Sequence, residues 1–120
     1  MGRYIVFKNN ATKEVLLSFR AGSYPESPGR FLEENLSLKW DADVYYDIHT
    51  FKNETFFEVN QEIQKVRGEI ALNLIKRDFE NFDFLNLIET YENLLEIRGI
   101  LCAISEMFED HNNEMLISYG

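Results

Sequence analysis

The chain has 120 residues, of which 45% are hydrophobic, and a formal net charge of −9. This length suits one domain with a single core, and the apolar content excludes a disordered chain. No run approaches the ~18 apolar residues of a membrane span, and the acidity argues against general nucleic-acid binding, because phosphate contacts require Lys and Arg.

The N-terminal segment predicts a β-hairpin. Residues 3–8 are mostly β-branched or aromatic, as strands usually are. Asn9 and Asn10 open a turn, since Asn tolerates the left-handed backbone region. Residues 14–20 then alternate between apolar and polar side chains, which favours a second, antiparallel strand.

The next segment predicts a loop, a short helix and a third strand. Both prolines fall in the loop over residues 21–29, where Ser27-Pro28 has the form of a helix cap followed by Pro at the first helical position. We therefore expect a helix over residues 28–36. Residues 43–51 alternate again and predict a strand.

Residues 55–80 form the most regular amphipathic pattern in the chain. The tetrapeptide from Thr55 to Glu58 matches a capping box and predicts the helix start. Apolar residues follow at spacings of three and four, which places one face of the helix inward: Phe56, Val59, Ile63, Val66, Ile70 and Leu74.

Asn81 and Asp83 predict a break, with Asn81 closing one helix and Asp83 capping a second helix that runs to Asp110. A connection this short favours two antiparallel helices. The apolar face of the second helix shifts at Gly99. We expect either a kink there or a first half packed on the other helix and a second half packed on the sheet.

A turn at residues 111–113 and a final strand over residues 114–119 complete the pattern. The predicted fold class is α+β, an antiparallel sheet of three to four short strands packed against a long C-terminal helical hairpin. We expect one domain over residues 1–120. It has a β-rich part over about 1–53, the hairpin over about 55–110, and the last strand.

The charge is distributed unevenly. Residues 1–77 carry eleven bases and eleven acids, whereas residues 78–120 carry ten acids and only Arg98 as a base. Ordinary surfaces mix both signs, so this imbalance favours a surface that binds a basic partner. The expected contact residues are Asp78, Glu80, Asp83, Glu89, Glu92, Glu96, Glu106, Glu109 and Asp110.

Other side chains offer weaker candidates. Tyr24, Trp40 and Tyr45 suit aromatic interface anchors if they are exposed. Cys102 lies in an apolar run and is interpreted as an inert core residue. His111 follows a helix end, where a cation is mildly favoured, and Arg98 is expected to pair with an acid or extend into solvent.

Four polar residues form the best catalytic candidate, in which a general base or metal ligands would lie on one strand face: Asp41, Asp43, Asp47 and His49. Cys102 as a nucleophile paired with His49 or His111 is a weaker alternative. An ordinary solvated sheet face is the competing interpretation, and no catalytic residue, metal or cofactor is expected.

Three hypotheses follow. The first is a non-enzymatic inhibitor or immunity-type protein that binds a basic nuclease, toxin or nucleic-acid-guided effector. The second is an accessory protein that self-associates through the hairpin, with a homodimer as one outcome. The third is a metal-dependent hydrolase or nuclease. One cysteine and no secretory signal pattern favour the cytoplasm, and the many Asn, Ile and Phe residues suggest a bacterial or phage source.

Overall fold

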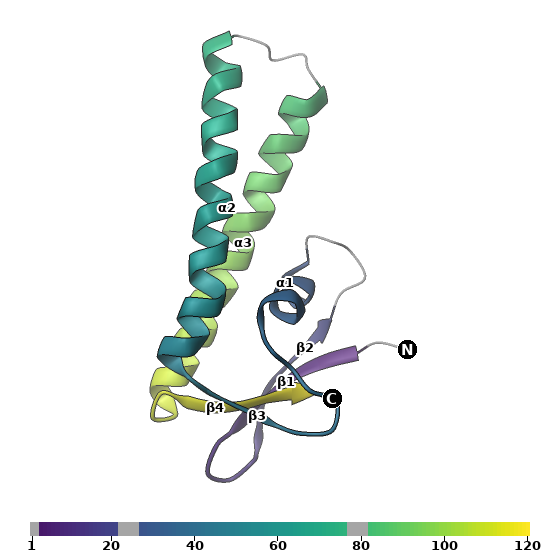
Figure 1. Ribbon diagram of the computed structural model, residues 1–120, viewed down its shortest axis with the longest axis vertical. Helices are drawn as coiled ribbons and strands as arrows, with labels where there is room; N and C mark the ends of the chain where they lie inside the picture. Colours follow the sequence, from purple (N-terminus) through teal and green to yellow (C-terminus); the bar gives the residue numbers. More distant parts are fainter. Residues whose placement is uncertain (1–2, 22–26, 77–81) are drawn as a thin grey trace.

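The computed structural model describes residues 3–21, 27–76 and 82–120, and the α+β prediction is confirmed. Two long helices rise side by side from one end of a small sheet (Figure 1). The described elements, in chain order, are β1 (Arg3–Asn9), β2 (Val15–Ala21), α1 (Pro28–Asn35), β3 (Val44–Asp47), α2 (Ile48–Lys76), α3 (Phe82–Asp110) and β4 (Glu114–Tyr119).

The sheet is antiparallel, with strand order β2-β1-β4-β3. The predicted hairpin of β1 and β2 is confirmed, and the predicted last strand lies between β1 and β3. The side chain of Asn9 accepts hydrogen bonds from the backbone N–H groups of Ala11 and Thr12, at 2.8 and 3.1 Å. The left-handed residue of this turn is Lys13, with φ of 61°, rather than an asparagine.

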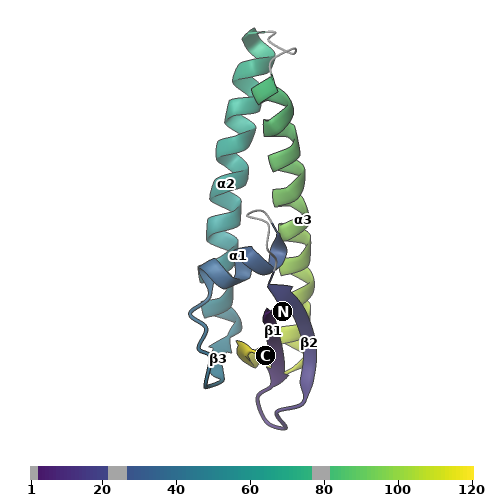
Figure 2. The same cartoon turned by 90° about the vertical axis from the view of Figure 1, so that its right-hand side faces the viewer.

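Helix α1 begins as predicted. The Ser27 hydroxyl accepts a hydrogen bond from the Arg30 N–H at 3.2 Å, and Pro28 occupies the first turn. Gly29 lets the helix approach β2, because a Cβ at this position would collide with the Arg20 carbonyl oxygen. Ser27, Pro28 and Gly29 therefore determine where α1 begins and how closely it packs against β2 (Figure 2).

The third strand is shorter than predicted, and α2 starts earlier. The chain turns helical at Ile48, and Asp47 caps the helix by accepting the Thr50 N–H at 2.7 Å. The predicted capping box is wrong, since Thr55 is buried inside α2 and its hydroxyl donates to the Phe51 carbonyl. The early start buries Ile48 and Phe51, and this apolar burial outweighs the local cap pattern.

Removing the Asp47 cap is expected to lower the melting temperature by roughly 2–5 °C at neutral pH in Asp47→Ala. The hydrogen bond from the Thr50 N–H holds the pKa of Asp47 below 3.8. Stabilisation by this carboxylate is therefore present above pH 3.8 and lost as the pH falls through the lower, folded-state pKa. Asp47→Asn keeps an acceptor, so thermal unfolding monitored by circular dichroism should show little loss. Equal losses in both variants would contradict the capping role.

The core lies where the lower half of the helix pair meets the sheet. Its fully buried apolar members come from the sheet, from both long helices and from α1, namely Ile5, Phe7, Leu32, Phe51, Val59, Leu101, Ile104, Phe108, Met115 and Ile117. Helix α3 runs unbroken through Gly99, and the buried side chains among its described residues begin at Ile97. This matches the second of the two predicted arrangements, in which only the later half of α3 packs on the sheet.

Among the described residues, no other helix or strand covers the distal half of the helix pair, and the molecule is elongated, 55 × 32 × 18 Å (Figures 1 and 2). Leu74, predicted to face inward, is 50% exposed, and Ile75 is 77% exposed. Helix α3 begins at Phe82, so Asp83 lies in its first turn and does not precede it as a cap. The predicted role of Asn81 falls outside the described residues.

Candidate interaction surface

The four polar residues of the catalytic candidate do not form one site. Asp47 caps α2, and His49 is exposed in the first turn of that helix. Asp43 pairs with Lys8, at 3.1 Å between Oδ1 and Nζ, and this bond lowers the pKa of Asp43. Across the described residues, no three or more His, Cys, Asp or Glu side chains are placed to hold a metal ion. The strand face on which the hydrolase hypothesis depended is therefore interrupted by a helix.

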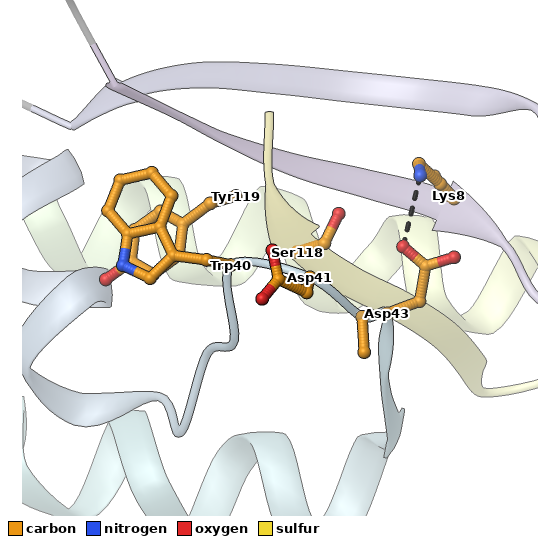
Figure 3. Close-up of a pocket in the computed structure, with 7 residues that line it drawn as sticks. Lys8, Trp40, Asp41, Asp43, Ser118 and Tyr119 are labelled. Carbon is orange, nitrogen blue, oxygen red and sulfur yellow. Dashed lines mark hydrogen bonds and ion pairs between the residues drawn. The ribbon is translucent and has the colours of Figure 1, made fainter.

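An open pocket of about 270 Å³ lies beside the Lys8–Asp43 pair (Figure 3). The indole of Trp40 stacks on Tyr119 at one end of it, with ring centres 4.4 Å apart and planes at 16°. Asp41 lies between this stacked pair and Asp43. The opposite charges of Lys8 and Asp43 neutralise each other, which leaves Asp41 as a single net negative charge among the residues that line the pocket.

Two of the three predicted aromatic anchors are exposed. Trp40 is 62% exposed and is held by its stacking on Tyr119. Tyr45 is 50% exposed, and its hydroxyl donates to Glu114 at 2.7 Å, a bond that raises the pKa of Tyr45. Tyr24 lies outside the described residues.

The strongest candidate surface is a line of carboxylates on α3. Starting at Glu89, steps of three and four residues reach seven positions that are all exposed, namely Glu89, Glu92, Glu96, Gly99, Ala103, Glu106 and Asp110. We call these seven positions the acidic ridge. With 3.6 residues per turn and 1.5 Å per residue, they form one stripe ~32 Å long, facing away from the buried side of α3.

Bases do not neutralise this surface. Helix α3 carries seven acids and one base, a net charge of −6, whereas α2 carries four of each. The ion pairs found within the described residues are Arg3–Glu33, Lys8–Asp43 and Arg30–Glu34, and none of them uses a carboxylate of α3. Arg98 is exposed, which agrees with the expectation that it extends into solvent, and it lies off the stripe. The ridge therefore keeps its negative potential.

The other predicted contact residues have different positions. Glu109 is exposed on α3 but off the ridge. Asp83 belongs to the first turn of the same helix, and Asp78 and Glu80 lie outside the described residues. Gly99 and Ala103, which the charge count did not single out, complete the stripe. Between Glu96 and Glu106 the ridge therefore has neither a carboxylate nor a long side chain.

The interpretation of Cys102 as a core residue is wrong, because its side chain is exposed. Leu101 and Ile104 of the same apolar run face the core, which turns Cys102 and Ala103 toward solvent. His111 lies just after α3, and its Nδ1 is 3.2 Å from the side-chain amide nitrogen of Asn9. It ties the end of the helix to the hairpin.

None of the helices in the described part of the chain is long and apolar enough to cross a membrane. Comparisons of the chain with family models, with curated proteins and with solved structures find no match.

Proposed function

We propose that this protein is a small non-enzymatic binding protein that engages a basic partner through the acidic ridge. The single observation that carries the proposal is the alignment of five unpaired carboxylates on one exposed face of α3. A solvated helix face usually mixes both signs of charge, and α2 shows that mixture. The ridge is therefore suited to groups of Lys and Arg side chains on another protein.

The charge spacing indicates the class of partner. Five carboxylates over ~32 Å are roughly half as dense as the phosphates along one DNA strand, which follow every ~3.4 Å. Lysine and arginine side chains that normally bind a nucleic-acid backbone can pair with such a line. An inhibitor or immunity-type protein for a nuclease, toxin or nucleic-acid-guided effector fits this chemistry. The proposal includes a cytoplasmic setting in a bacterial or phage system.

Salt dependence tests the proposal with a defined probe, an arginine-rich peptide of about ten residues. Screening shortens the reach of charges from ~30 Å at 0.01 M salt to ~8 Å at 0.15 M. We expect isothermal titration to show that the dissociation constant rises at least tenfold over this range. No binding at low salt, or an affinity that salt leaves unchanged, would contradict an electrostatic ridge.

A further inference from the structure

A second surface, on the outer side of α2, has the opposite character. Seven residues of this helix, each three or four positions after an earlier one, have exposed and uncharged side chains. They lie on the side of α2 opposite the one that packs on α3. We call this set the uncharged strip: Phe57, Gln61, Gln64, Gly68, Ala71, Leu72 and Ile75. In Figure 1, no other coloured helix or strand lies along the side of α2 that faces away from α3.

The isolated chain gives no reason for this composition. Phe57 is 59% exposed, Leu72 is 56% exposed and Ile75 is 77% exposed. Apart from the neighbouring backbone of α2 itself, a Cβ added at Gly68 would meet no atom within 4 Å. Glycine inside a helix costs about 1 kcal/mol relative to alanine, and here no packing within the chain offsets that cost. A second backbone that approaches closely is one reason for a glycine at such a position.

Charge favours a second copy of this chain as the occupant. Each α2 helix is neutral overall, so a contact between two of them brings no net charge into the interface, whereas a contact between two α3 helices would bring together two net charges of −6. A strongly basic or acidic partner would find no counter-charge on the strip itself. The strip is therefore suited to contact between identical copies, and it lies on a different helix from the acidic ridge.

Side-chain sizes favour an antiparallel arrangement. When two strips run in opposite directions about an axis near Val66, Phe57 lies opposite Ile75 of the second copy, and Gln64 lies opposite Gly68. A long side chain thus meets a position without one, as interdigitating helices require. We propose that this protein forms a two-fold dimer through antiparallel contact of the uncharged strips of α2, with both acidic ridges facing outward.

The size of the strip predicts a weak dimer. Residues 57–75 span ~27 Å, and a helix is about 10 Å wide, so each copy contributes roughly 300–500 Å². The two copies together would bury roughly 600–1,000 Å², which is below the ~1,200 Å² of a standard stable interface. The dimer should therefore form at high micromolar concentrations and dissociate on dilution.

Sedimentation equilibrium from about 10 µM to about 1 mM tests the interface. The full chain is expected to shift toward twice its monomer mass, and Gln64→Glu with Ala71→Glu should raise the dimer dissociation constant at least tenfold. Ser18→Glu with Asn86→Glu adds the same two charges at exposed sites off the strip and should dimerise like the parent. A parent that stays monomeric at the highest concentration, or two variants that weaken equally, would overturn the proposal.

Disulfide cross-linking tests the direction of the helices. The variants Gln64→Cys and Gly68→Cys are made separately in a Cys102→Ser background, which removes the exposed native thiol. The antiparallel register predicts that a mixture of the two forms covalent dimers several times faster than either variant alone. Faster cross-linking of each variant with itself, as parallel helices would give, or no cross-linking of the mixture, would overturn the register.

Discussion

Replacing Phe51 by alanine is expected to lower the free energy of unfolding by about 3–5 kcal/mol. The Phe51 ring is fully buried and contacts Phe108 on α3, with ring centres 4.9 Å apart, and Phe7 on β1, at 6.4 Å. One side chain thus joins both long helices to the sheet, and its removal leaves a cavity at their junction. Because domains of this size are stable by only ~5–15 kcal/mol, the variant should lose a large share of its stability.

Phe57→Ala is the matched control, since it removes the same side chain from the same helix at a position that is 59% exposed. Its free energy of unfolding should stay within about 0.5 kcal/mol of the parent value. Urea denaturation of both variants should be measured in dilute solution, where the proposed α2 contact is dissociated. Equal losses in the two variants would contradict the placement of Phe51 at the junction.

Much of the fold could be predicted because most segments carry one dominant periodicity. The alternation in β2 and the spacing of Val59, Ile63 and Val66 each match the observed element. The start of α2 could not be found this way, since residues 43–51 alternate like a strand. Contacts distant in sequence decide it, including the hydrogen bond from the Ile48 N–H to the Asn113 carbonyl.

The candidate surface was only partly predictable from the sequence. Counting charges located the acids, but whether they form one stripe depends on α3 continuing through Gly99 without a break. The exposure of Cys102 was missed because an unbroken apolar run hides which of its members face the core. The exposed apolar side chains of distal α2, such as Leu74, also match a core pattern, since periodicity alone cannot show where the covering layer ends.

Reversing three charges of the ridge should nearly abolish binding to a basic probe. Exposed ion pairs contribute ~0.2–1 kcal/mol each, and replacing an attraction by a repulsion roughly doubles the change. For Glu89→Lys, Glu92→Lys and Glu96→Lys together, the loss is about 3 kcal/mol, or roughly 100-fold in the dissociation constant. All three side chains are exposed, so the fold should be retained.

The control must separate the ridge from total charge. Glu14→Lys, Asp41→Lys and Glu58→Lys also change three exposed acids. Each triple variant changes the net charge by six, from −9 to −3. Any general attraction of an acidic protein for a cation is therefore weakened equally in both.

The dissociation constant of the arginine-rich peptide, measured for these two triple variants side by side at low salt, separates binding by the ridge from binding by total charge. The ridge variant is expected to bind about 100 times more weakly than the parent, and the control variant within about threefold of it. Similar losses in both variants would mean that the peptide responds to total charge alone, and the acidic ridge would then have no special role in binding.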